Sequence, residues 1–143
     1  MGEELRLIVD PEIAFIAEID ERPVGMCIAL PNINEAIRDF DGKLGPKEVA
    51  KLLWRLKVKR LVSARLMMLG IRRELRGVKK YGGLSHAMYV EVAKRGEKVG
   101  YQWGELSWTL EDNAPVNLGI RSMGAKLYKK YRVYEKAIEG AER

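Results

Sequence analysis

The stretch "RRELRGVKKYGGLSHAMYVEVAKRG" (Arg72–Gly96) joins a basic, glycine-containing turn to a segment with helical periodicity. Leu84, Met88 and Val92 are spaced four apart, which places them on one face of a helix, and Gly96 is expected to end it. A turn directly before a helix leaves backbone amides unpaired, and such amides bind phosphate groups. The stretch therefore predicts a helix whose start is a candidate phosphate-binding site.

Strands are predicted on both sides of this helix. The segment "LVSARLMMLGI" (61–71) is apolar enough for a buried strand, which Gly70 is expected to break. The segment "WGELSWTLEDN" (103–113) alternates polar and apolar residues, so it predicts a strand with one face toward the core. Asn113 can cap a following helix, and Gly124 is expected to close that helix.

The rest of the chain adds further elements of both kinds. The segment 13–30 predicts a β-hairpin, and 32–42 predicts a short helix. Apolar residues repeat at helical spacing from Pro46 to Lys57, which indicates an amphipathic helix, and 125–138 is expected to be a last strand. We expect one domain over residues 1–143, with an α/β (α+β) fold in which helices flank a mixed, mostly antiparallel sheet.

Composition narrows the classes of protein. The chain has 143 residues, of which 47% are hydrophobic and 32% charged, as in a globular domain. It contains no run of eighteen apolar residues, so we expect no membrane span and no membrane partner. The acidic start "MGEELRLIVD" does not resemble a signal peptide, which favours a cytoplasmic location. With Cys27 and His86 as the only cysteine and histidine, we expect no metal site and no internal disulfide.

Charged residues suggest two further hypotheses. Glu105, Glu111 and Asp112 gather near the end of a predicted strand, where Glu105 can serve as a general base through water or simply point to solvent. The formal net charge of +6 suits an anionic partner, although basic runs are commonly solvated faces.

His86 is expected to be an exposed helix residue, and Cys27 to lie in the core.

The order of elements resembles that of the GNAT superfamily of N-acetyltransferases. The resemblance covers roughly residues 13–138 and includes "LMMLGI", the turn "RRELRGVKKYGGL" and the ending "GYQWGELSWTLEDNAPVNLGIRSMGAKLYKKYRVYEKAI". That ending looks like bacterial GNAT-like proteins in which "ELSW", "EDN" and a "G…YK.YR.Y" strand recur together. The resemblance implies acetyl-CoA or another acyl-CoA as co-substrate and an amine, of unknown identity, as acceptor.

The resemblance also assigns residues. In the superfamily, the amides of a turn Arg/Gln-x-x-Gly-x-Gly/Ala bind the pyrophosphate of acetyl-CoA. Leu84 fixes the alignment, so that Arg76 matches the leading residue while Lys79 and Tyr81 occupy the two glycine positions. The cofactor-binding residues implied in this way are Leu69, Gly70, Ile71, Arg76, Gly77, Val78, Lys79, Lys80, Tyr81, Gly82 and Asn113.

Two departures from the superfamily leave catalysis open. Ile120 stands where the superfamily usually places a tyrosine that protonates the leaving thiolate. Only about a dozen residues precede the predicted hairpin, so the fold is expected to be N-terminally shortened. We carry three hypotheses: a GNAT-like N-acyltransferase or its C-terminal domain with Glu105 as proton relay, a non-catalytic binding module that forms a homodimer, and a nucleic-acid binder using "YKKYRVY".

Overall fold

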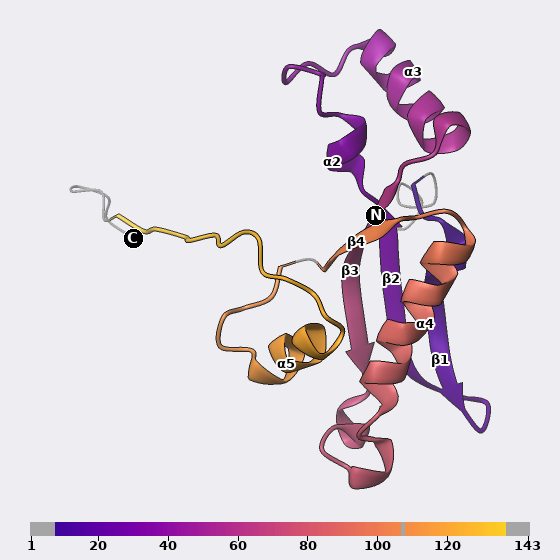
Figure 1. Cartoon of the computed structure of the whole chain (residues 1–143), viewed down its shortest axis with the longest axis vertical. Helices are drawn as coiled ribbons and strands as arrows, with labels where there is room; N and C mark the ends of the chain where they lie inside the picture. The colour runs from indigo at the N-terminus through magenta and orange to yellow at the C-terminus, as the bar shows by residue number, and fades with distance from the viewer. Residues whose placement is uncertain (1–7, 107, 137–143) are drawn as a thin grey trace, which may run out of the picture.

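A four-stranded mixed sheet forms the centre of the molecule. The computed structural model describes residues 8–106 and 108–136. The strands lie in the order β1-β2-β3-β4; β1, β2 and β3 pair antiparallel, whereas β4 runs parallel to β3 (Figure 1). Their bounds are Ala14–Ile19 (β1), Arg22–Pro31 (β2), Ser63–Ile71 (β3) and Trp103–Leu106 (β4). The expected mixed, mostly antiparallel sheet is confirmed.

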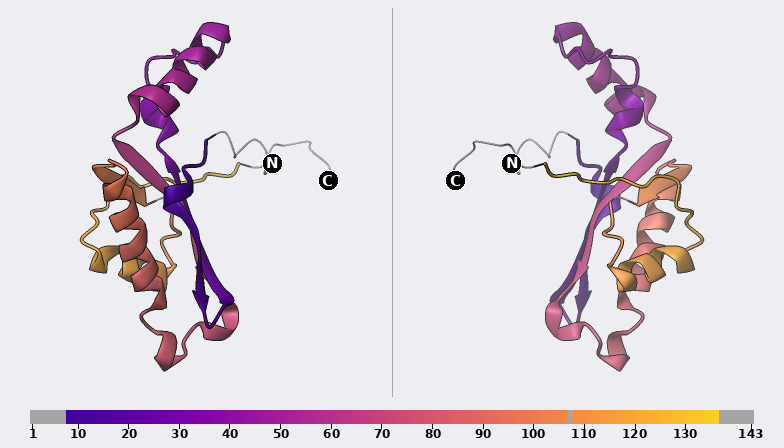
Figure 2. Two further views of the ribbon diagram at one scale, coloured as in Figure 1. Left: turned by 90° about the vertical axis from the view of Figure 1, so that its right-hand side faces the viewer. Right: turned by 90° about the vertical axis from the view of Figure 1, so that its left-hand side faces the viewer.

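Helices lie on one face of the sheet and beyond one of its ends. The α-helices are α2 (Ile33–Ala36), α3 (Pro46–Trp54), α4 (Leu84–Lys98) and α5 (Ala114–Ser122). A π-helical turn, Arg55–Lys59, extends α3, and short 3-10 turns occur at Pro11–Ile13, Arg73–Leu75 and Lys79–Tyr81. Figure 2 shows α4 and α5 on the same side of the sheet, while α2 and α3 project past its end.

The predicted hairpin forms because a two-residue turn joins two strands with alternating burial. Asp20 and Glu21 take positive φ angles of 49° and 62°, which match the twist of a tight hairpin. In β2, Val24, Cys27 and Ala29 are buried, and α4 covers this part of the strand with Met88. Burial raises the pKa of the Cys27 thiol to about 11, so it is a neutral core residue, as expected.

Two glycines do not interrupt the elements that contain them. β3 runs through Gly70 and ends at Ile71. Gly70 adopts the extended backbone of the strand, and nothing lies within 4 Å of the position that a Cβ would take there. α4 continues past Gly96, which is buried next to the Tyr101 side chain, and the left-handed residue after its end is Gly100. The predicted strand break and the predicted helix end were therefore both wrong.

The predicted last strand is also absent among the described residues. Residues 125–136 form no helix or strand and have no ladder partner. Glu111 anchors them through Lys130 at 2.6 Å and Arg132 at 2.7 Å, and Tyr131 lies 6.0 Å from the Trp108 ring. The edge strand β4 ends at Leu106 after four residues, so it offers the alternating residues only a short edge to pair with.

Candidate functional site

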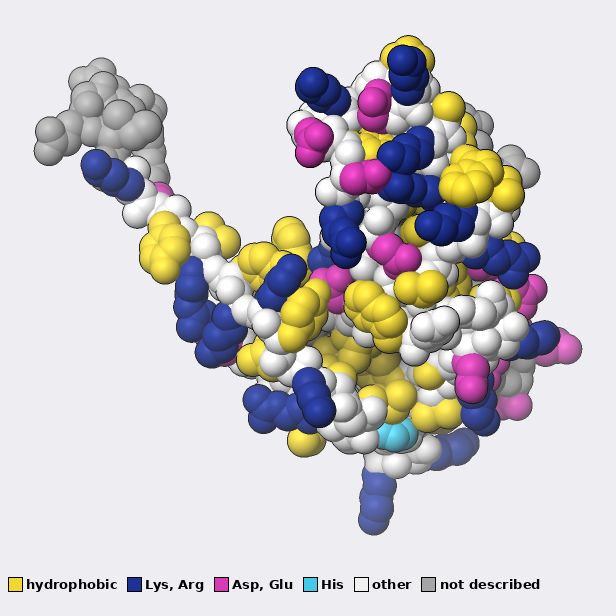
Figure 3. Space-filling view, turned by 45° about the horizontal axis from the view of Figure 1, so that its top comes forward, with side chains coloured by type: hydrophobic (Ala, Val, Ile, Leu, Met, Phe, Trp, Pro, Cys, Tyr) yellow, Lys and Arg dark blue, Asp and Glu magenta, His cyan; other side chains and the backbone are white. Residues whose placement is uncertain are grey.

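A pocket opens where β3 and β4 separate. The two strands pair only between Ser63–Leu66 and Trp103–Leu106. Beyond that point lies a pocket of about 400 Å³, and Figure 3 shows hydrophobic side chains gathered in the hollow between the body and the extended C-terminal segment. The lining residues are Met26, Leu66, Met67, Met68, Leu69, Gly70, Tyr89, Leu106, Trp108, Thr109, Leu110, Asn113, Val116 and Ile120. None of these residues carries a charge.

The backbone of β3 faces this pocket with hydrogen-bonding groups. The Arg72 amide donates to the Val24 carbonyl at 2.9 Å, and the register pairs Gly25 with Ile71. Hydrogen-bonded pairs alternate along an antiparallel ladder, so Gly70 bonds to β2 while Leu69 and Ile71 direct their amides and carbonyls away from β2. Arg76 Nε donates to the Ile71 carbonyl at 3.1 Å. The Leu69 amide and carbonyl and the Ile71 amide thus point toward the gap.

A β-bulge shapes the same stretch of β3. Met68 pairs with Ile28 and Leu66 pairs with Ala29, so Met67 has no partner in β2. Such a bulge increases local twist and is often found beside binding sites. Here it lies at the point where β3 leaves β4, and Met67 itself lines the pocket.

The basic turn lies between the end of β3 and the start of α4. Gly83 is the N-cap of α4 and provides no side-chain cap, so the first amides of the helix are unpaired. Gly77 has a φ of 75°, whereas Lys79 and Tyr81 form a 3-10 turn with ordinary backbone angles. The lysine and the tyrosine therefore occupy positions whose backbone conformation does not require glycine.

Helix α5 and the loop before it close one side of the pocket. Asn113 is the N-cap of α5 and lines the pocket, but its side chain makes no cap bond. Asn117 holds the loop instead: its Nδ2 donates to the Leu110 carbonyl at 2.9 Å, and its Oδ1 accepts from Thr109 Oγ1 at 2.7 Å. Sequence reasoning missed Asn117, although an asparagine inside a helix is a signal for a side-chain bond to nearby backbone.

Glu105 lies beside the pocket rather than in its lining. It pairs with Arg65 on β3, with 3.7 Å between Oε1 and Nη2, and the Arg65 guanidinium lies 5.9 Å from the Trp108 ring. Its neighbour Leu106 lines the pocket, and successive strand residues point to opposite faces. The role of Glu105 as a base stays a prediction.

The other clustered carboxylate, Glu111, is engaged elsewhere. The Glu111 carboxylate accepts hydrogen bonds from Lys130, which has the larger effect, and from Arg132. These bonds lower the pKa of the Glu111 carboxyl to about 2. A carboxylate that weakly basic does not take a proton from an amine near neutral pH. Glu111 is a tether for the C-terminal segment.

The predicted site residues fall into two groups. Leu69, Gly70 and Asn113 line the pocket, and Ile71 follows directly on the same strand. The segment 76–82 forms the separate turn before α4. The sequence did not predict Tyr89, which is buried on α4 with its ring packed beside Gly119, 3.4 Å from where a Cβ at that position would lie. Burial raises the pKa of the Tyr89 phenol.

Two kinds of site are missing from the part of the chain that the structure describes. Across 8–106 and 108–136, no group of three His, Cys, Asp or Glu residues could hold a metal ion. No helix in these ranges combines the length and the apolar character that crossing a bilayer requires.

Comparison with known proteins yields two curated relatives. The chain is 38% identical over 138 residues to the bacterial ceramide synthase of Caulobacter vibrioides (strain NA1000 / CB15N). It is 40% identical over 141 residues to protein YghO of Escherichia coli (strain K12). Each alignment covers 96% of this chain but only 36% and 35% of the relatives, so the chain spans about a third of their length. No family model matches the chain.

Solved structures show the fold. The chain resembles the aminoglycoside N-acetyltransferase AAC(6')-Iy in complex with CoA (TM-score 0.55, 14% identity, 87% of this chain and 75% of that one). The same enzyme with a CoA bisubstrate analogue gives a TM-score of 0.55 and 14% identity over 87% and 69% of the chains. The apo 6'-N-acetyltransferase AAC(6')-IG of Acinetobacter haemolyticus gives 0.57 and 13% over 96% and 79%. The chain thus has the GNAT acetyltransferase fold that its sequence resembles.

Proposed function

We propose that the chain binds an acyl-CoA and takes part in transferring its acyl group to an amine. The observation that carries this proposal is the outward-facing Leu69 backbone at the wall of the apolar pocket. Two findings support it: N-acetyltransferases share the fold, and one relative is named for the synthesis of ceramide, which is an N-acylated amino alcohol. That the whole protein uses an amine as the acceptor of the acyl group is likewise a proposal.

The proposed orientation of acyl-CoA follows from the free polar groups. The amide groups of the pantetheine arm would pair with the Leu69 amide and carbonyl and with the Ile71 amide, as an added strand does. The pyrophosphate would lie at the unpaired amides that begin α4, where the helix dipole favours an anion. Lys79 and Lys80 would add positive charge there.

The pocket composition favours an apolar acyl chain. Three methionines, Met26, Met67 and Met68, line it, and methionine side chains adapt to flexible apolar ligands. No carboxylate is available among the lining residues to receive a polycationic acceptor such as an aminoglycoside. We therefore propose a fatty acyl group in preference to acetyl.

Isothermal titration of the full chain with CoA, acetyl-CoA and palmitoyl-CoA tests these statements. We expect affinity to rise with chain length, by up to about fourfold for each buried methylene. No heat with any of the three at millimolar concentration would contradict the CoA site. Equal affinity for all three would contradict the acyl pocket alone. Binding without transfer to a panel of long-chain amines would assign the chain to a non-catalytic module.

Tyr89 is the proposed proton donor. When the amine attacks the thioester carbonyl, a C–N bond forms and the C–S bond breaks; the nitrogen gives up a proton to solvent water, and the CoA thiolate needs a proton. Ile120 cannot supply one, whereas Tyr89 is a phenol in the lining. We expect Tyr89→Phe to lower kcat about tenfold with KM unchanged, a small effect for acid catalysis because a thiolate leaves readily. An unchanged kcat in steady-state assays would contradict this role.

A further inference from the structure

Helix α3 turns its cationic side toward the protein. Lys51 Nζ lies 2.6 Å from Asp39 Oδ2, and the Arg55 guanidinium binds both Asp39 and the Ala36 carbonyl. Both cations also lie over the Phe40 ring, at 6.0 Å and 5.9 Å from its centre. The half-buried residues of this segment are Glu48, Leu52, Arg55 and Leu56, so the inward side of α3 mixes charged and apolar residues instead of being purely apolar.

Part of the apolar surface of α3 is exposed. Val49 and Leu53 lie on the opposite side from Lys51 and Arg55, with exposed fractions of 40% and 44%. Trp54 and Val58 are exposed at 51% and 66%, and no residue of α3 is buried. Figures 1 and 2 show that α3 projects past the end of the sheet, away from α4 and α5. A surface of this kind marks an interaction site.

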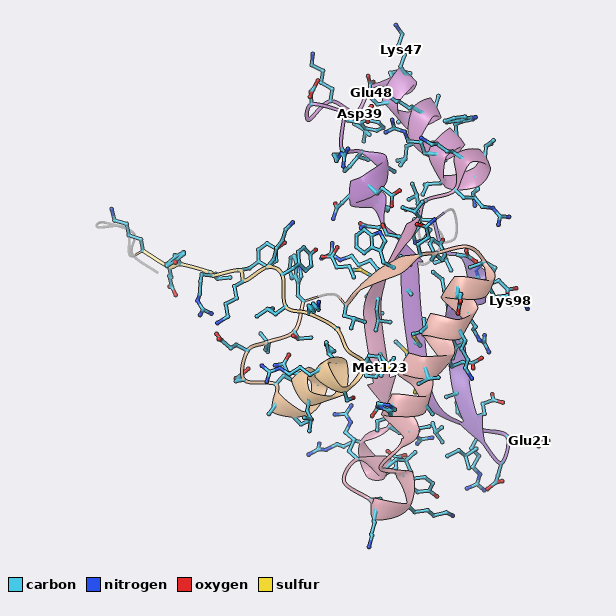
Figure 4. All side chains as sticks on the ribbon, viewed as in Figure 1. Glu21, Asp39, Lys47, Glu48, Lys98 and Met123 are labelled. Atoms are coloured by element: carbon cyan, nitrogen blue, oxygen red, sulfur yellow. The ribbon has the colours of Figure 1, made fainter. Side chains whose placement is uncertain are left out.

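The same segment carries a concentration of positive charge. Between Lys43 and Arg60 there are seven basic residues and one acidic residue, Glu48, a local excess equal to the formal net charge of +6 of the whole chain. Lys47 lies at the tip of α3 (Figure 4). Among the described residues, Lys47, Lys57 and Lys59 form no ion pair. An anionic surface would complement this segment.

We propose that the α3 surface, defined by Val49, Leu53, Trp54, Val58 and the lysines around them, docks on an anionic lipid bilayer. Aliphatic side chains and a tryptophan enter the headgroup region, while lysines reach lipid phosphates. A nine-residue helix is too short to span a bilayer and would lie in the plane of the interface, so the proposal agrees with the lack of a spanning helix among the described residues but departs from the expectation of no membrane partner. Nucleic acid would satisfy the cations but offers little to Val49 and Leu53. The inference goes beyond the proposed acyl transfer and needs no acyl-CoA.

Co-sedimentation of the full chain with vesicles tests the inference. We expect binding to phosphatidylcholine vesicles containing phosphatidylglycerol, weaker binding as salt is raised, and little binding to phosphatidylcholine alone. Leu53→Glu is expected to weaken vesicle binding by about tenfold or more, because a charge enters the interface poorly. The matched control is Leu118→Glu, which changes a 70% exposed leucine of the equally long helix α5 and should leave binding unchanged.

Several outcomes would overturn the inference. Wild-type protein that fails to bind anionic vesicles at low ionic strength excludes a lipid surface, and binding to an oligonucleotide instead would assign the cations to nucleic acid. Equal losses in Leu53→Glu and Leu118→Glu would show an effect of net charge alone. A wild-type dimer that Leu53→Glu dissociates in analytical ultracentrifugation would assign the surface to a second copy. Circular dichroism of both variants establishes that they fold.

Discussion

The Leu69→Pro protein is expected to fold and to bind acyl-CoA at least about tenfold more weakly than the wild type. A loss of this size corresponds to one good hydrogen bond between protein and ligand. The Leu69 amide points away from β2, so its removal costs the sheet no hydrogen bond. The residue before a proline prefers extended backbone, which Met68 already has as part of β3. What the substitution removes is the donor that the proposed pantetheine contact needs.

Gly70→Pro is the matched control for this prediction. Gly70 is in register with Met26 at a position where the two strands exchange hydrogen bonds, so a proline there removes a bond within the sheet. We expect it to lower the free energy of unfolding by about 3 kcal/mol, whereas Leu69→Pro costs much less. Isothermal titration and urea denaturation of both proteins separate binding from folding. Wild-type affinity in a folded Leu69→Pro protein would refute the backbone contact.

Local patterns in the sequence predicted the elements that depend on neighbouring residues. The hairpin 13–30 follows from alternation around the turn at Asp20–Glu21, and the helix after Gly83 follows from four-residue spacing. Leu69, Gly70 and Asn113, which the resemblance assigns to a cofactor site, line the pocket, while their role in binding acyl-CoA stays a prediction. The hairpin and helix predictions each need information from only a short stretch of chain, whereas the site residues were assigned through a resemblance over most of its length.

The errors concern partners that are distant in the sequence. The segment 125–136 has an alternating pattern, but whether it forms a strand depends on the length of the free sheet edge, and the edge strand β4 is only four residues long. Tyr89 was missed because its place in the pocket depends on α5 packing beside α4 through Gly119. The way α3 faces the protein depends in part on Asp39, a residue outside the helix that binds Lys51 and Arg55. Spacing within the helix predicts its apolar side but not such a partner.

Gly25 is the position where a larger side chain is expected to cost the most stability. A Cβ at Gly25 would lie 2.9 Å from the Gly70 carbonyl oxygen and 2.9 Å from Met88 Sδ, closer than side-chain atoms tolerate. The strand carbonyl cannot move without disturbing the β2–β3 pairing next to the pocket. We expect Gly25→Ala to lower the free energy of unfolding by about 2 kcal/mol and Gly25→Val by more, as in other overpacked cores.

Two further variants identify the obstacle at Gly25. Gly70→Ala is the control, because nothing lies within 4 Å of its added Cβ, and its free energy of unfolding should stay within about 0.5 kcal/mol of wild type. Gly25→Ala is then measured again in a Met88→Ala background. If the strand carbonyl is the main obstacle, the cost of Gly25→Ala persists there, because a shorter side chain at 88 relieves only the sulfur contact. A cost that disappears would instead show that α4, rather than the pairing of β2 with β3, requires glycine at this position.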